Sequence, residues 1–303
     1  MSNSTYSGPV RSLNGFAHVD KSDGTHRDYS TLGLRYGGDA SRYTLEERFL
    51  QRPALNADID QVHTVEVARG ANRNFEVLGT NMTTALCTFD TTRGGITITT
   101  AGADQDQAII APHLDTTTNQ TDCNSAWNGV EWGTENQLVW MGVISTNAID
   151  NQKVWAGLKL TNDQLVATDA DQMFFKFQTD ATNSEAFTDF TKLHFVHSIG
   201  GTDYISQLPI TVAANTTYFL KIEVDSARKA TIWVNGVQYH VTTTAGSTGG
   251  TAVSSVSESQ TPVKTGALTN DVDLIPYIGI EAGAAAAESL DVHYEGISRV
   301  IFE

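Results

Sequence analysis

Apolar and polar residues alternate along several segments of this chain, and this period of two limits the possible folds more than any other feature of the sequence. The alternation is clearest in residues 96–99, 154–160, 173–177 and 218–225. Successive side chains of a β-strand point to opposite faces, so these segments are predicted to be strands with one face on a core. Residues 138–144 are apolar at almost every position, which predicts a central strand covered on both sides.

Turn signals and further strands extend this pattern toward the end of the chain. Asn235 and Gly236 separate two segments with strand character, and the Asn-Gly pair favours a tight two-residue hairpin. Further strands are expected at residues 274–281 and 290–302. About a dozen strands with almost no helix between them predict an all-β fold, a two-sheet antiparallel sandwich of jelly-roll type. We place this sandwich at residues 59–303.

Two segments depart from the strand pattern. Residues 1–58 are interrupted by glycines throughout, which predicts an extended, irregular N-terminal arm. The arm has one helix signal: Thr44 and Glu47 stand at the spacing of a capping box, and Pro53 limits the short helix that would follow. Residues 245–266 are rich in Ser, Thr and Gly and have few large apolar side chains, so we expect an exposed loop or ribbon there.

Charge excludes two classes of partner. The chain has a net charge of −16 at pH 7, and its surface is expected to repel nucleic-acid phosphates and anionic lipids. The arm carries equal numbers of basic and acidic residues, so residues 59–303 hold the whole net charge. No apolar segment approaches the roughly 20 residues of a membrane-spanning helix. We therefore expect neither a nucleic-acid partner nor a membrane partner.

The chain has two cysteines, Cys87 and Cys123, which are too few for a disulfide framework and do not form a CxxC metal pair. Residues 1–9 lack the basic and apolar regions of a signal peptide, so synthesis in a cytoplasm is expected.

Two acidic pairs have the residue types of a catalytic site. Retaining glycosidases need two carboxyl groups about 5–5.5 Å apart, and Glu223 and Asp225 are the closest acidic pair on one face of a clear strand. A polar turn follows Asp225, which favours a solvated strand face over a catalytic pair. Glu131 and Glu135 flank Trp132, where packing at the start of the next strand is favoured over a sugar site.

Metal sites are not supported by the sequence either. His194 and His197 are three residues apart, which places their rings on opposite faces of a strand. Asp169 and Asp171 lack the remaining ligands of a calcium loop and are interpreted as turn residues, and the same holds for the segment around Asp20. The sequence therefore predicts no catalytic residues, no metal, no cofactor and no enzymatic activity.

Three tryptophans remain as candidates for recognition. Trp127, Trp132 and Trp155 have three possible roles: they stack on sugar rings, cap the core or line a contact between subunits. The sequence does not separate these alternatives.

Several segments together carry a resemblance to known proteins: residues 74–80, 94–98, 104–115, 132–137, 154–160, 170–175, 218–225 and 232–236. They resemble virion structural proteins of tailed bacteriophages, and the strand pair on either side of Asn235 is similar to that of concanavalin A-like lectin and glucanase sandwiches. The Glu-x-Asp-x-x-Glu strand of glucanases is absent, so the resemblance does not imply hydrolase activity.

The resemblance implies a capsid cement or decoration protein. Such a protein would bind the outer surface of a phage head, hold together junctions of the major capsid protein, and contact copies of itself as a homo-oligomer in the virion. The arm would make these contacts, or it would wrap its own sandwich; the two alternatives stay open. A glycan-binding tail or fibre module that touches the host is the alternative function. Tyr and Arg dominate binding hot spots, so the candidate contact residues are Tyr6, Arg11, Arg35, Tyr43 and Arg48.

Overall fold

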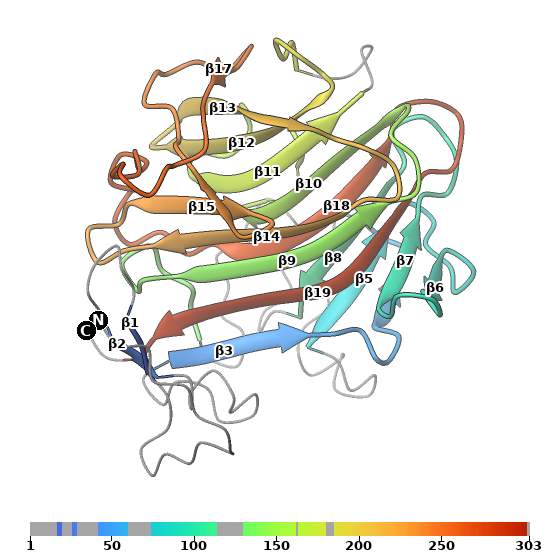
Figure 1. Ribbon diagram of the computed structural model, residues 1–303. Coiled ribbons are helices and arrows are strands. Elements are labelled where there is room, and N and C mark those ends of the chain that lie inside the picture. The colour runs from blue at the N-terminus through green and yellow to red at the C-terminus, as the bar shows by residue number, and fades with distance from the viewer. Residues whose placement is uncertain are drawn as a thin grey trace, which may run out of the picture.

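The computed structural model describes residues 17–19, 26–28, 42–59, 74–113, 130–161, 163–179 and 185–301. These residues form strands, turns and loops, and no helix occurs among them. Most of the strands belong to two sheets that pack face to face, and Figure 1 shows one sheet in front of the other. The predicted all-β, two-sheet jelly-roll sandwich is confirmed. Accordingly, none of the described residues lies in a helix that could cross a membrane.

The first sheet has nine strands, which are antiparallel except for a parallel pair at each edge. In spatial order they are β17 (Thr251–Ala252), β13 (Thr202–Thr211), β12 (Lys192–Ile199), β11 (Gln172–Gln178), β10 (Gln152–Lys159), β18 (Ile275–Ala282), β8 (Gln107–Pro112), β5 (Phe75–Gly79) and β4 (Ala54–Asn56).

The second sheet has eight strands. In spatial order, seven of them are β16 (Val237–Tyr239), β15 (Ala230–Val234), β14 (Thr217–Val224), β9 (Val139–Thr146), β19 (Ser289–Val300), β7 (Ile96–Thr99) and β6 (Cys87–Phe89), and β3 (Arg42–Glu47) pairs with the far end of β19. The short strands β1 (Ala17–Val19) and β2 (His26–Asp28) form a separate antiparallel pair.

The core lies between the sheets and follows the predicted alternation. On β14, the side chains of Tyr218, Leu220, Ile222 and Val224 are buried, whereas that of Phe219 between them is 58% exposed. On β10, the side chains of Val154, Ala156 and Leu158 are likewise buried and face inward. Burying apolar surface stabilises the fold by about 25 cal/mol per Å². The apolar face of each strand therefore turns inward.

The hairpin at residues 235–236 forms as predicted. Asn235 and Gly236 have φ angles of 52° and 78° and join β15 to β16. A tight turn with two positive φ angles matches the twist of the flanking strands, and Asn and Gly adopt such angles at little cost.

The predicted short helix in the arm is wrong, because residues 42–47 are strand β3. Leu45 is buried and lies opposite Ile297 of β19, and this pairing outweighs the local capping signal. The Glu47 carboxylate does accept bonds from two backbone amides, those of Arg48 and Phe49, but it does so in a turn after a strand. Strands β3 and β4 place this part of the predicted arm in the two sheets, and a division of the chain at residue 58 stays a prediction.

Strand β9 is central in its sheet, between β14 and β19, as residues 138–144 predicted. Its outer face is not covered, however, since Met141 is 40% exposed. The apolar residues on that face therefore do not belong to the core.

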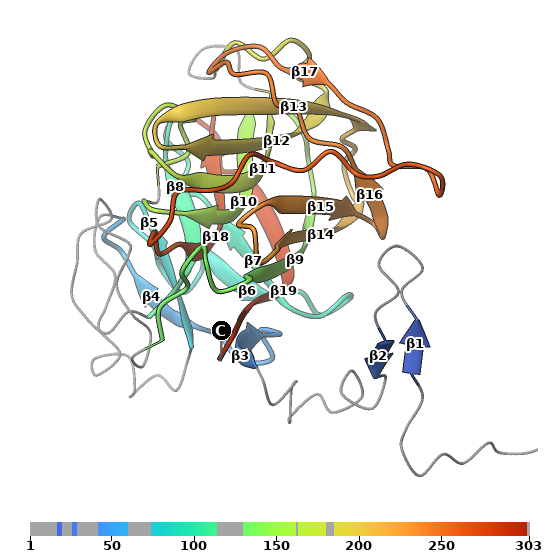
Figure 2. The same ribbon diagram turned by 90° about the vertical axis from the view of Figure 1, so that its left-hand side faces the viewer.

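Residues 245–266 lie along one side of the molecule, in the orange part of the chain in Figure 2. Most of their side chains are exposed. Val253 donates its backbone N–H to the carbonyl oxygen of Gln207 in β13, and Val256 donates to that of Gln238 in β16. The segment thus covers open edges of both sheets, where unpaired backbone groups would otherwise invite another strand.

Candidate functional site

The outer face of the nine-stranded sheet carries polar side chains that are nevertheless buried. Trp155 of β10, Lys176 of β11, His194 of β12 and Gln207 of β13 stand side by side across four neighbouring strands. We call these four residues the polar row. The first three are fully buried and Gln207 is half-buried, although the row lies on the side of the sheet that faces away from the core.

Glycine allows the tryptophan to lie flat at one end of the row. Trp155 pairs with Gly279 of β18, and a Cβ atom added to Gly279 would lie 2.5 Å from Cζ2 of the indole. Any larger residue at position 279 would push the ring off the sheet.

Several polar atoms along the row have no hydrogen-bond partner. They are Nε1 of Trp155 and Oε1 of Gln207, and Oε1 of Gln178 beside the row is unpaired as well. The ring nitrogens of His194 have no partner at full hydrogen-bond geometry, although the Lys192 backbone lies close enough to act on the ring. A buried polar atom without a partner costs about 1–3 kcal/mol, and native proteins contain few of them. A line of such atoms across adjacent strands therefore needs a partner such as water or a polar ligand.

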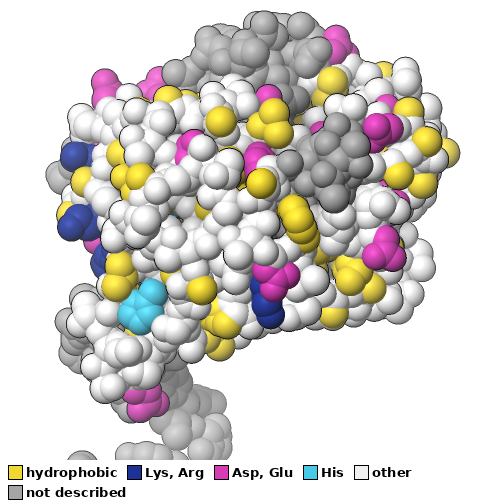
Figure 3. Space-filling view, turned by 90° about the horizontal axis from the view of Figure 1, so that it is seen from above, with side chains coloured by type: hydrophobic (Ala, Val, Ile, Leu, Met, Phe, Trp, Pro, Cys, Tyr) yellow, Lys and Arg dark blue, Asp and Glu magenta, His cyan; other side chains and the backbone are white. Residues whose placement is uncertain are grey.

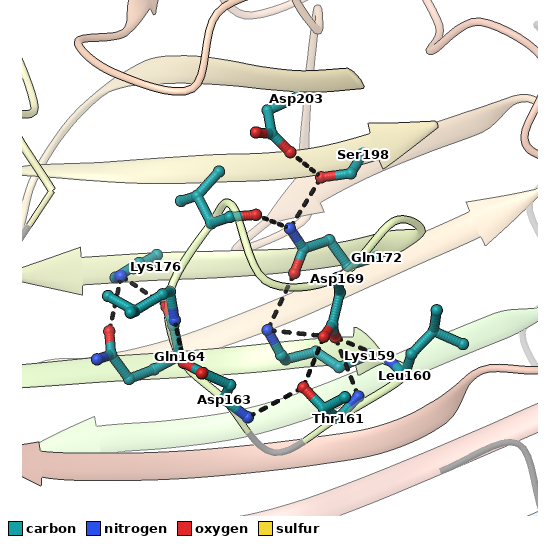
Figure 4. A network of polar contacts seen from close by, with 12 residues as sticks. Lys159, Leu160, Thr161, Asp163, Gln164, Asp169, Gln172, Lys176, Ser198 and Asp203 are labelled. Carbon is teal, nitrogen blue, oxygen red and sulfur yellow. Dashed lines mark hydrogen bonds and ion pairs between the residues drawn. The ribbon is translucent and has the colours of Figure 1, made fainter. Parts of the chain in front are cut away.

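Two segments cover the row. Lys176 Nζ donates to the backbone oxygen of Gln164 at 2.7 Å and to its side-chain oxygen at 3.0 Å, and it pairs with Glu185. On the neighbouring strand, Lys159 Nζ lies 3.6 Å from a carboxylate oxygen of Asp169. These lysines hold residues 163–171 against the sheet, as the dashed contacts in Figure 4 show.

Aromatic and glycine contacts complete the cover. The ring of Phe187 lies 4.1 Å from that of His194, measured between centroids. Gly250 lies against the same histidine. The row is therefore closed by the protein's own chain, and a ligand would have to displace Phe187 to reach His194.

Burial changes the protonation of two members of the row. It lowers the pKa of Lys176 to about 8, although the nearby Glu185 carboxylate acts in the opposite direction. Burial also lowers the pKa of His194 to about 4, so its ring is neutral at pH 7. A neutral imidazole offers one hydrogen-bond donor and one acceptor, which suits a hydroxyl group.

The charges on this face are paired. Besides the pairs of Lys176 and Lys159, Lys153 Nζ lies 2.5 Å from a carboxylate oxygen of Glu281. Gln107 donates to the other oxygen of Glu281 at 2.7 Å. Each lysine is thus neutralised by a carboxylate, which leaves hydrogen bonding as the main means of recognition here.

The predicted contact residues do not come together in a described site. Tyr6, Arg11 and Arg35 lie outside the described residues. Tyr43 is exposed on β3, near the guanidinium of Arg299, and Arg48 is exposed just after β3, with its guanidinium carbon 5.9 Å from the ring centroid of Tyr294. Both face solvent at one edge of the eight-stranded sheet, and their role in binding a partner stays a prediction.

The structure limits the roles that Trp132 and Trp155 can have. Trp132 and Trp155 are both buried, so neither is an exposed stacking platform. Both belong to the cluster of buried hydrophobic residues, and Trp155 does so from the sheet face that carries the polar row. Trp127 lies outside the described residues.

The other candidate residues have structural roles. Glu223 pairs with Lys221, and Asp225 pairs with Lys264 and accepts bonds from the amides of Ala227 and Lys229. A catalytic acidic pair is therefore not formed by Glu223 and Asp225.

His194, His197 and Asp169 behave as predicted, whereas Asp20 lies outside the described residues. His194 and His197 lie on opposite faces of β12, and His197 stacks on Tyr204. Asp169 accepts bonds from the amides of Leu160 and Thr161 and closes a turn. Within the described ranges, no group of three or more His, Cys, Asp or Glu residues is placed to hold a metal ion.

One further cluster has the residue types of a hydrolase triad. Ser145 Oγ lies 3.0 Å from Nε2 of His293, whose Nδ1 lies 2.5 Å from the Gly94 carbonyl oxygen. Ser145 is fully buried, and Asp291 binds Arg93 and Thr97. A nucleophile without access and an acid committed to other partners make this a structural cluster.

The sequence interpretation missed the polar row because its members are far apart in the chain. The available signal was local: Lys176 stands between Phe175 and Phe177 in a strand with three phenylalanines. A lysine at such a position indicates an outward face that carries polar groups.

Comparison with known proteins adds the following. No family model and no curated protein matches this sequence. Among solved structures, family 7 alginate lyase A1-II' is similar over 74% of this chain and 85% of its own, with a TM-score of 0.42 and 14% identity. Bacillus licheniformis β-glucanase is similar over 84% and 97% (TM-score 0.42, 11% identity). The carbohydrate recognition domain of Emp46p is similar over 74% and 87% (TM-score 0.41, 6% identity).

These likenesses concern the fold alone, and the similar structures include lectin and glucanase sandwiches. The expectation that the chain is not an enzyme is corrected here. An alginate lyase and a β-glucanase are among the similar structures, so the fold does not exclude catalysis. The resemblance to phage virion proteins finds no support in these comparisons.

Proposed function

We propose that the protein binds a carbohydrate at the polar row on the outer face of the nine-stranded sheet. The observation that carries the proposal is the line of unpaired buried polar atoms on Trp155, His194 and Gln207. Sugar hydroxyl groups both donate and accept hydrogen bonds, so one saccharide chain pairs with indole N–H, imidazole and amide oxygen together. The row crosses four strands, a length of about 14 Å at the usual strand spacing.

The charges of this face favour an uncharged saccharide. The lysines beside the row are already paired with Glu185, Asp169 and Glu281. The whole chain carries −16, and acidic side chains outnumber basic ones on the face seen from above (Figure 3). A polyanionic glycan would be repelled at long range, and the buried lysines beside the row are already paired with carboxylates.

Binding at this row replaces contacts with the protein's own chain. Phe187 covers His194, and the segment 185–190 must leave the row before a saccharide enters. Binding is therefore expected to be slower than diffusion, as it is for other sites that open before they bind. The capsid cement role, the major capsid protein as a partner and a virion location stay predictions that rest on the resemblance alone.

A pair of histidine variants tests the proposal. His194→Phe keeps the ring but removes both nitrogens from the row, and it is expected to weaken binding of a neutral oligosaccharide about tenfold or more. His197→Phe is the matched control, because this histidine is equally buried on the same strand but faces the core. Isothermal titration calorimetry against a panel of neutral and uronate-containing oligosaccharides measures both.

Two results would overturn the proposal. One is the absence of binding to every member of the panel by the wild-type protein. The other is equal affinity of the wild-type protein and His194→Phe for a glycan that does bind.

A further inference from the structure

The outer face of the eight-stranded sheet has an apolar centre that stands open. Phe219 of β14 and Met141 of β9 are 58% and 40% exposed. Half-buried Val143 of β9 is the cross-strand partner of Phe219, and half-buried Tyr294 of β19 is the next partner along. In the same way, half-buried Trp233 of β15 and Met141 are the two cross-strand partners of Lys221. We call these five apolar and aromatic residues the apolar patch. Their strands lie side by side across the front of the molecule in Figure 1.

The charged groups around the apolar patch are balanced in sign. Lys221 pairs with Glu223 at 2.5 Å and lies over the ring of Trp233. Arg48 lies over the ring of Tyr294, and the Tyr294 hydroxyl donates to Glu46. This face therefore has no local excess of negative charge, although the chain as a whole carries −16.

The face is large enough for a specific contact. Strands β14 and β9 have eight residues each. Eight residues at about 3.3 Å each, across the four strands of the patch at about 4.8 Å, give roughly 500 Å². Two such faces bury roughly 1,000 Å², about the minimum expected of a biological interface.

We propose that the apolar patch binds the same patch of a second copy of this chain in a two-fold symmetric dimer. A two-fold axis places Lys221 of one copy opposite Glu223 of the other, so the face complements itself. The long-range repulsion between two chains of charge −16 works against contact through acidic surfaces, and this balanced face escapes it. The centre of the patch is apolar, which favours burial against another apolar patch over contact with a saccharide.

Sedimentation velocity measurements over a dilution series test the dimer. The wild-type protein is expected to dimerise, and Phe219→Glu is expected to raise the dimer dissociation constant roughly tenfold or more. Val263→Glu is the matched control: Val263 is 44% exposed but belongs to the 245–266 segment, so dimerisation is expected to persist. Circular dichroism confirms that each variant is folded.

A charge reversal separates a specific contact from general stickiness. Lys221→Glu is expected to weaken the dimer, and the double variant Lys221→Glu with Glu223→Lys restores it because the face again complements itself. A wild-type protein that is monomeric throughout the series overturns the proposal, as does a folded Phe219→Glu variant that dimerises like the wild type. A capture of a saccharide by this face, lost in Phe219→Glu, also overturns it. His194→Phe lies on the other sheet and leaves the dimer unchanged, so the two proposals fail independently.

Discussion

The outer faces of the two sheets both depart from ordinary burial: one has buried polar side chains, and the other has exposed apolar side chains. The face of the nine-stranded sheet carries Lys153, Lys159, Lys176 and His194, and its side chains are buried under segments of the chain. The face of the eight-stranded sheet carries Phe219 and Met141 at its centre, and both are exposed. Polar groups under cover and apolar groups in the open are the two informative exceptions to ordinary burial. This difference is the basis for proposing a polar ligand at one face and a protein partner at the other.

The largest expected difference between the faces concerns their lysines. Lys176→Ala removes the partner of Glu185 in a buried place and is expected to lower the free energy of unfolding by about 3–5 kcal/mol. Lys221→Ala removes a half-exposed pair with Glu223, which is worth about 0–1 kcal/mol. Urea denaturation measures both. Equal losses for the two variants would show that the cover over the polar face does not exclude water.

The interior between the faces holds a carboxyl group that makes stability depend on pH. Glu295 of β19 is fully buried, accepts one bond from Trp140 Nε1, and has its second oxygen unpaired. Burial raises the pKa of Glu295 from 4.5 to about 8. The folded state therefore holds a proton that the unfolded chain has released, and this stability is fully present below pH 4.5 and is lost as pH rises through 8.

Glu295→Gln is expected to remove this dependence. The variant keeps the bond to Trp140 and should be more stable than the wild type above pH 8, by on the order of a few kcal/mol. Glu223→Gln on the exposed face is the control and should leave the slope unchanged. Denaturant midpoints at a series of pH values provide the measurement, and parallel curves for the wild type and Glu295→Gln would contradict the assignment.

The smallest effect separates two glycines, one on each outer face. Gly279→Ala places a Cβ against the indole of Trp155, which is fixed under cover, and should cost about 1–3 kcal/mol. Gly296→Ala meets the hydroxyl of Tyr294, the far end of a half-exposed side chain that can turn toward solvent, and should cost less than about 1 kcal/mol. Thermal unfolding measures the pair. The reverse order would mean that the uncovered face is the more tightly packed one.

How well the sequence predicts each part of the fold depends on how far apart in the chain the interacting residues are. Strands such as β14 and the turn at Asn235 are encoded by neighbouring residues, so alternation and an Asn-Gly pair suffice to predict them. The capping box at Thr44 failed because pairing with β19, some 250 residues away, decides the conformation there. The local pattern of residues 42–47 contains no trace of that partner.

The candidate site could not be predicted from the sequence, for the same reason. Trp155, Lys176, His194 and Gln207 become neighbours only through the registers of three strand pairs. The cover over them depends on long-range contacts as well, such as that of Lys176 with Glu185. The alternation does show which residues face outward, but it does not show that the chain folds back over them.

The central claim is that the polar row of the nine-stranded sheet, and not the open face of the other sheet, receives a saccharide. The indole N–H resonances of ¹⁵N-labelled protein test it directly during titration with the neutral oligosaccharide that binds best. The account predicts that the Trp155 resonance shifts in a saturable way, since its Nε1 gains a partner, while the resonance of Trp233 stays in place. A shift of Trp233 with no change at Trp155 would contradict the account.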